Sequence, residues 1–353
     1  MSVLPAARPL VVPGRASAGR LTRTSARLLG LGFALLIMGM VVIASLALGS
    51  REVDPVAVVQ ALVAPDGSVA QRIVTDLRMP RTVVALAVGM ALGTAGLLMQ
   101  GLTRNPIADP GILGVSAGAS FGVVLSIRFL GASDPATFIW FAIAGAALAT
   151  VLVHVLSRGR QRLDDPVRLV LAGAVISMLL QAGVSAVLVN DVETLDRYRF
   201  WTVGSLSEAD PAVLVMLLPL LVVGGVIAVL ATRSMDALAL GDDVARSLGA
   251  RVGLVRVGVS AGIVLLTASA VVLAGPIVFV GLVVPHVARA VVGPDHRWAL
   301  PYCVIAGGIL VLAADTLGRL VIRPAELQVG IMTALIGAPV LILLVRRRSP
   351  VGA

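Results

Sequence analysis

Long apolar segments alternate with short polar connections along almost the whole chain. Ten segments are apolar over close to the length that a membrane-spanning helix requires, which is about 20 residues. We expect them at 29–49, 82–101, 112–131, 136–156, 169–189, 211–231, 256–275, 277–292, 299–318 and 327–345. The eighth is short for a full crossing, so we expect a half-length or steeply packed helix there. The pattern predicts an all-α, polytopic membrane protein with about ten transmembrane helices.

Composition agrees with a membrane protein. Apolar residues make up 58% of the chain and charged residues 13%, and the mean hydropathy of +1.01 is far above that of a soluble domain. We therefore expect one transmembrane domain over residues 29–347. An Arg-rich, disordered N-terminal tail over 1–28 and a C-terminal tail over 348–353 would flank it.

The basic residues predict the orientation. All 28 are arginine. With both termini inside, the inner segments hold 19 arginines and 7 acidic residues, and the outer segments hold 9 and 12. An excess of positive charge on inner loops is typical of membrane proteins, so we expect both termini in the cytoplasm.

A helical hairpin is predicted between residues 78 and 120. Its two apolar segments are rich in glycine, and Asn105-Pro106 followed by Asp109-Pro110-Gly111 forms the turn between them. Small residues at such spacing let helix backbones approach closely within lipid. We therefore expect close helix contacts in this region.

A short amphipathic helix is expected in the inner segment 233–256. Gly241 can supply a turn, Asp242 and Asp243 suit a helix N-terminus, and Gly249 can end the helix. Val244, Ala245 and Leu248 should then share one face. Such a helix is either a lid on the bundle or an element that docks in a partner's groove.

Two arginines flank Pro80 at an outer helix end, namely Arg78 and Arg81, and Arg319 and Arg323 lie near another outer end. They can anchor a helix at the lipid headgroups. Alternatively, they can dock an acidic patch on an extracytoplasmic partner, because charges at an interface rim steer association.

Acidic side chains are rare within the apolar segments. Asp315 lies four residues before Arg319, so the two should share a helix face and form a partly buried ion pair. A proton-coupling role for Asp315 is the alternative. Glu326 is expected to cap the start of the last helix.

Two prolines, Pro276 and Pro285, are expected to interrupt the helical run over 274–289, and broken helices often line a transport pathway. His286 follows, but no second ligand stands at metal-binding spacing, so we interpret it as a structural hydrogen-bonding residue and assign no metal site.

Enzymatic chemistry has no support in the sequence. The chain contains no GxxxxGK[ST] motif and no lysine, so it cannot supply the phosphate-binding lysine of a P-loop. Neither a Ser–His–acid set nor a carboxylate pair is recognisable, and no cofactor is expected. If the chain is a transporter, two classes remain open. Transport can be driven by ATP hydrolysis on other chains, or the protein can be an ion-coupled secondary transporter.

Several motifs occur in a fixed order: RMPR (78–81), Q…RNPIADPGILGVSAGA (100–119), WTVGSL (201–206), LGDDVARSLG (240–249), FVGLVVPHVAR (279–289), AD…R (314–319), AEL (325–327) and GAP (337–339). In these motifs the chain resembles the FecCD-type permease subunits of ATP-binding-cassette (ABC) importers for iron–siderophore complexes, haem and vitamin B12. The resemblance covers about residues 30–347.

This resemblance implies a bacterial cell-membrane permease that pairs with a second permease subunit, either a copy of itself or a paralogue. Two cytoplasmic ATPases and an extracytoplasmic binding protein would complete the importer, with a ferric siderophore as the favoured cargo. It implies three groups of site residues. ATPase coupling falls to Gly241, Asp242, Asp243, Ala245, Leu248 and Gly249. Docking of the binding protein falls to Arg78, Arg81 and Arg319. The translocation path or its helix packing falls to Gln100, Asn105, Pro106, Gly114, Ser116, Gly118, Gly281 and Pro285.

Overall fold

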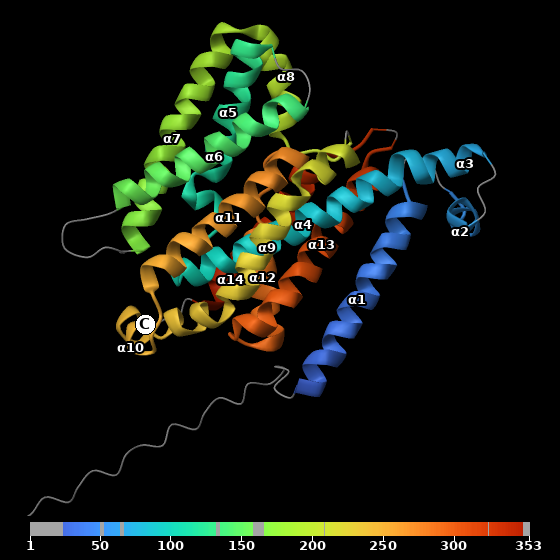
Figure 1. Ribbon diagram of the computed structural model, residues 1–353. Coiled ribbons are helices and arrows are strands. Elements are labelled where there is room, and N and C mark those ends of the chain that lie inside the picture. Colours follow the sequence, from blue (N-terminus) through green and yellow to red (C-terminus); the bar gives the residue numbers. More distant parts are fainter. Residues whose placement is uncertain are drawn as a thin grey trace, which may run out of the picture.

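The computed structural model describes residues 24–49, 53–63, 67–131, 135–157, 166–207, 209–323 and 325–348, and within these ranges it contains helices and no strand. Figure 1 shows the helices in chain order. They are α1 Thr24–Ala47, α2 Pro55–Val63, α3 Val69–Arg72, the π-helix η1 Ile73–Arg78, α4 Met79–Thr103, the 3-10 helix η2 Pro110–Leu113, α5 Val115–Leu130, α6 Pro135–Ser157, α7 Pro166–Asn190, α8 Val192–Thr202, α9 Pro211–Ala239, α10 Asp242–Ser247, α11 Val252–Ala274, α12 Val280–Val292, α13 His296–Val321 and α14 Val329–Arg348.

The predicted all-α membrane fold is confirmed. Among the described residues, seven helical segments are long and apolar enough to cross a membrane, and α5, α12 and α14 contribute three shorter apolar helices. Each of the ten predicted spans overlaps one of these. The eighth span is the short helix α12, which has 13 residues.

The start of α1 corrects the predicted tail. The helix begins at Thr24, so residues 24–28, which we assigned to a disordered tail, are helical. The first turn is held by α13: the Tyr302 hydroxyl donates to the Arg27 carbonyl at 2.7 Å, and the Arg27 guanidinium lies 5.2 Å from the ring centre of Trp298. The rest of the predicted tail, 1–23, and residues 349–353 lie outside the described residues.

Helix α4 runs through the centre of the bundle and is buried along most of its length. It packs against α9, α11, α12 and α13, and Figure 1 shows it crossing between them. Two contacts leave no room for a side chain. A Cβ atom on Gly89 would collide with the carbonyl of Gly307 in α13, and one on Gly96 would collide with that of Gly281. The predicted close helix contacts are therefore present.

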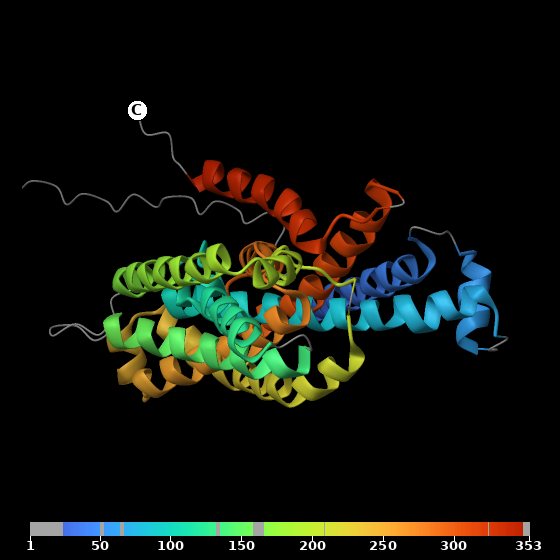
Figure 2. The same cartoon turned by 90° about the horizontal axis from the view of Figure 1, so that it is seen from above.

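Helices α5–α8 form a second group beside this centre (Figures 1 and 2). A Cβ atom on Gly118 of α5 would likewise collide with the carbonyl of Gly145 in α6. The group meets α11 through α5 and α6, where Ser260 Oγ and His154 Nε2 lie 2.9 Å apart. These helices therefore join the bundle mainly along one face.

The two ends of the bundle differ. We call the end that carries α2, α3, η1 and α8 the outer end, and the end that carries α10 the inner end (Figure 1). Helix α8 was not expected from the sequence. Its N-cap is Asp191, whose carboxylate accepts from the Thr194 hydroxyl at 2.6 Å. This bond holds the pKa of Asp191 below its usual value.

Replacing Gly89 with alanine should lower the free energy of unfolding by about 1–3 kcal/mol, because the new methyl group forces α4 away from α13. The change would appear as a lower melting temperature of the purified protein in detergent. Gly258→Ala in α11 is the matched control, since a Cβ atom there meets nothing within 4 Å. Equal melting temperatures for the two variants would contradict the proposed close contact.

Candidate functional site

The outer end contains a cluster of arginines. One of them, Arg78, is buried within the protein. The π-helix η1 and Pro80 at the start of α4 set the positions of Arg78 and Arg81. Only 6% of Arg78 is exposed. Its guanidinium donates to the carbonyls of Leu46 and Ala47 at 2.6 and 2.8 Å. These carbonyls close α1 and have no partner within that helix, so Arg78 holds the end of α1.

Arg319 reaches the same helix end from α13. It donates to the Ser45 carbonyl at 3.2 Å and to the Ser45 hydroxyl at 2.8 Å, and 3% of the residue is exposed. A positive charge at a helix C-terminus is favourable because the helix dipole is negative there. Arg78 and Arg319, both predicted to dock a binding protein, therefore have intramolecular roles, and their docking role remains a prediction.

Arg81 binds two acidic residues. Its Nε lies 3.0 Å from both oxygens of Asp315, and its Nη2 donates to Asp315 Oδ1 at 2.8 Å. Its Nη1 donates to Glu326 at 2.7 Å. Arg319 Nε lies 3.3 Å from the other Asp315 oxygen. The predicted Asp315–Arg319 pair is present, and Glu326 pairs with Arg81, not with the start of α14, where we had expected it to form a cap.

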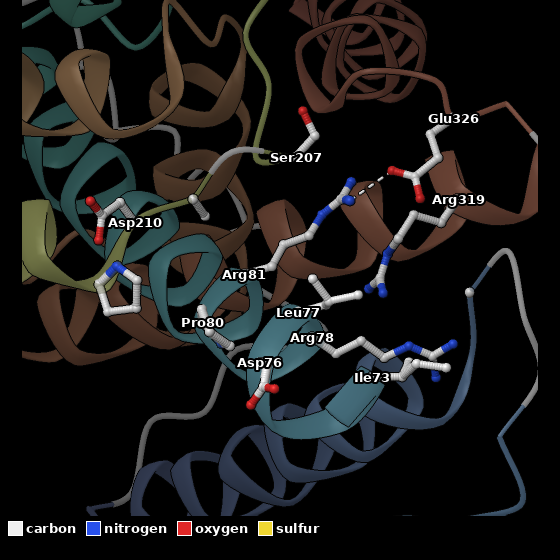
Figure 3. Close-up of a pocket in the computed structure, with 13 residues that line it drawn as sticks. Ile73, Asp76, Leu77, Arg78, Pro80, Arg81, Ser207, Asp210, Arg319 and Glu326 are labelled. Atoms are coloured by element: carbon white, nitrogen blue, oxygen red, sulfur yellow. Dashed lines mark hydrogen bonds and ion pairs between the residues drawn. The ribbon is translucent and has the colours of Figure 1, made fainter. Parts of the chain in front are cut away.

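A cavity of about 760 Å³ opens at this end. Its wall includes Arg78, Arg81, Arg319, Asp76, Asp210 and Glu326. Figure 3 shows Arg81, Arg319 and Glu326 converging, with Arg81 joined to Glu326. The wall therefore carries charges of both signs, a feature that can steer association with a charged partner.

The inner end presents the short helix α10. Gly241 precedes it at φ 111° and Gly249 follows it at φ 84°, conformations that favour glycine. The predicted apolar face is divided. Ala245 is buried, whereas Val244 and Leu248 are 43% and 65% exposed. The helix therefore buries one small residue and displays two larger apolar residues one turn apart.

The two aspartates of α10 also differ. Asp243 has a fully exposed side chain. Asp242 turns toward the bundle, where it pairs with Arg104 at the end of α4 and with Arg256 of α11. We had not predicted these pairs, nor that of Asp236 with His296, because the partners are far apart in sequence.

The predicted path residues make contacts within the chain. Gln100 is buried, donates to the carbonyls of Gly281 and Leu282 at 3.2 Å, and accepts from Arg289. The Asn105 carboxamide oxygen accepts from the backbone of Ile107 at 3.1 Å and so forms the turn before α5. Pro106 follows Asn105 in that turn.

The remaining predicted path residues lie in or beside helices. Gly114 precedes α5 at φ 72°, and Ser116 in its first turn is partly exposed. Pro285 is buried within α12, which continues through it, so the expected interruption is wrong at this position. A break does occur at Gly275–Phe279, which contains Pro276, so the interruption expected at Pro276 is confirmed. Whether these residues line a path remains a prediction.

Comparison with known proteins adds a family assignment to this geometry. The model of the FecCD transport family matches residues 35–347. The ferric enterobactin transport system permease protein FepD of Escherichia coli is 43% identical, with 88% of this chain and 92% of the relative covered. The "probable siderophore transport system permease protein YfiZ" of Bacillus subtilis is 40% identical, with 82% of this chain and 87% of the relative covered. A solved structure described as "a putative metal-chelate type ABC transporter" in an inward-facing conformation superimposes with a TM-score of 0.79 at 28% identity, covering 91% of this chain and 99% of that one.

Replacing Asp315 with asparagine should lower the free energy of unfolding by about 3–5 kcal/mol, because Arg81 and Arg319 then lose a shared buried counter-ion. Glu326→Gln, at a carboxylate with 31% side-chain exposure, should cost roughly 0–1 kcal/mol. Thermal unfolding in detergent compares the two variants. An equally small shift for both would contradict a structural role for the Asp315 pair.

Proposed function

The chain belongs to the FecCD transport family, and we propose that it is the transmembrane permease subunit of an ABC importer that moves a ferric siderophore into the cytoplasm. Haem and cobalamin, which are also metal chelates, are alternative cargoes. The family match over almost the whole transmembrane region is the observation that carries the proposal. Ferric siderophore is favoured because the two permeases compared above both serve siderophore transport.

The protein is a multi-pass transport subunit, and we place ATP hydrolysis on two separate cytoplasmic ATPase chains. This division agrees with the absence of lysine, which excludes a P-loop in this chain. Val244 and Leu248 on α10 present exposed apolar side chains that fit a groove on such a partner. ATP binding would move α10, and α10 would move the helices behind it.

The outer end would receive an extracytoplasmic binding protein that delivers the chelate. The charged cavity supports this role, because Arg81, whose side chain is 12% exposed, lies in its wall among charges of both signs. A second permease subunit would complete the translocation path. We propose the cytoplasmic membrane of a bacterium as the location of the chain, in agreement with these partners and with the predicted inside position of both termini.

An ion-coupled secondary transporter is the alternative. It requires an acidic side chain that can release and take up a proton along the path. Asp315 is held by Arg81 and Arg319 and is 1% exposed, so its charge already has two counter-ions. Uptake into proteoliposomes should therefore require ATP and the ATPase chains and should persist with a protonophore. Uptake that a protonophore abolishes, and that ATP depletion leaves intact, would establish the alternative.

Leu248→Ser combined with Val244→Ser should reduce co-purification of the ATPase chains at least about tenfold, because it removes the exposed apolar face of α10. Leu195→Ser is the control, since Leu195 is an exposed leucine of α8 at the outer end. Recovery of the ATPase chains is measured from detergent-solubilised membranes. Full recovery with the α10 variant would contradict docking through this face.

Arg81→Gln should weaken binding of the cognate binding protein about tenfold at low ionic strength, and the difference should shrink as salt screens the interaction. Arg72→Gln in α3, an exposed arginine at the same end, is the control. Affinities are compared between low and high salt on samples with matched melting temperatures. Unchanged affinity at low salt would leave Arg81 with a structural role only.

A further inference from the structure

Helix α10 cannot hold its own position. It has six residues, whereas isolated helices shorter than about 12–15 residues are marginal in water. Ala245 is its only buried side chain, and a single alanine contributes little apolar contact. The placement of α10 against the bundle must therefore depend on other interactions.

Asp242 supplies these interactions. Its carboxylate accepts from Arg256 of α11 at 2.9 and 3.2 Å and from Arg104, the residue that closes α4. Arg246, one turn along α10, lies 4.0 Å from the same carboxylate. One acidic group at the start of α10 thus joins the ends of two membrane helices.

The backbone at Arg104 is shaped for this contact. Arg104 adopts the left-handed conformation at φ 51°, one of two non-glycine residues with positive φ in the described part of the chain. Glycine would adopt this conformation without strain. The arginine side chain at this position makes a charge-assisted bond with Asp242.

The segment that leads into α10 is also fixed. Asp236 in the last turns of α9 accepts from the backbone NH of His296 at 3.0 Å, and its Oδ1 lies 2.7 Å from the His296 ring. Since His296 opens α13, the stretch from Asp236 to Asp242 is bound to α4, α11 and α13. Of these helices, α11 and α13 both pack against α4 at the centre of the bundle.

We propose that Asp242, Arg104 and Arg256 form an ionic linkage that transmits movement of α10 to α4 and α11. Asp242 is then a positioning residue that faces the bundle, and Asp243, Val244 and Leu248 form the side that meets the ATPase. The inference rests on the proposed function of α10. Among the predicted coupling residues, it separates Asp242, which transmits force to the bundle, from Asp243 and Leu248, which bind the partner.

The test uses the complete importer in proteoliposomes, with ferric enterobactin and its binding protein as the probe cargo. Asp242→Asn should leave recovery of the ATPase chains unchanged and raise the number of ATP molecules hydrolysed per chelate imported at least about tenfold. Arg256→Gln should have the same effect. The double variant should be no worse than Asp242→Asn alone, because Asp242→Asn already removes the pair with Arg256. Asp242→Glu should restore part of the coupling.

Asp196→Asn is the matched control, since Asp196 pairs with Arg199 at the outer end and should leave the ratio unchanged. Loss of ATPase recovery in Asp242→Asn would overturn the inference and make Asp242 a partner contact. Normal coupling in that variant would also overturn it. The Leu248→Ser, Val244→Ser variant distinguishes a failure of the proposed function of α10 from a failure of the ionic linkage alone. If it assembles and transports normally, the proposed function of α10 fails, and if it fails to assemble while Asp242→Asn transports normally, only the linkage fails.

Discussion

Direct contact between helix backbones at the centre of the bundle is the constraint on which the rest of the structure depends. Lipid offers no hydrophobic driving force between apolar helices, so their association rests on close packing. Gly89 and Gly96 of α4 lie against Gly307 and Gly281 with no room for a side chain. Because these contacts fix α4 in the centre, they also fix the position of the charged groups at its two ends.

Each end of α4 carries an arginine that binds a carboxylate from another part of the chain. Arg81 binds Asp315 at the outer end, and Arg104 binds Asp242 at the inner end. The 23 helical steps between these arginines span about 35 Å. One rigid helix therefore joins the cavity at which a binding protein would dock to the helix that an ATPase would move, and a shift at one end can reach the other without unfolding.

The membrane spans were predictable because length and apolar character suffice to define them, and α10 was predictable because Gly241 and Gly249 delimit it. The direction of single side chains was not. Arg78 was expected at the surface, yet it caps α1, and Asp242 was grouped with the exposed Asp243 although it faces the bundle. Adjacent residues on a helix point about 100° apart, and only the position of the neighbouring helices decides which of them is buried.

By itself, the sequence determined the class of protein, the number and order of the apolar segments, and the family through its ordered motifs, and its arginine distribution predicts their orientation. These properties follow from local composition and spacing. Only the tertiary structure decided that Asp315 is shared by Arg81 and Arg319, that Pro285 continues a helix, and that Asp242 joins α4 to α11. Such pairs link residues as far as 245 positions apart, and their free energy depends on distances and burial that exist only once the helices have packed.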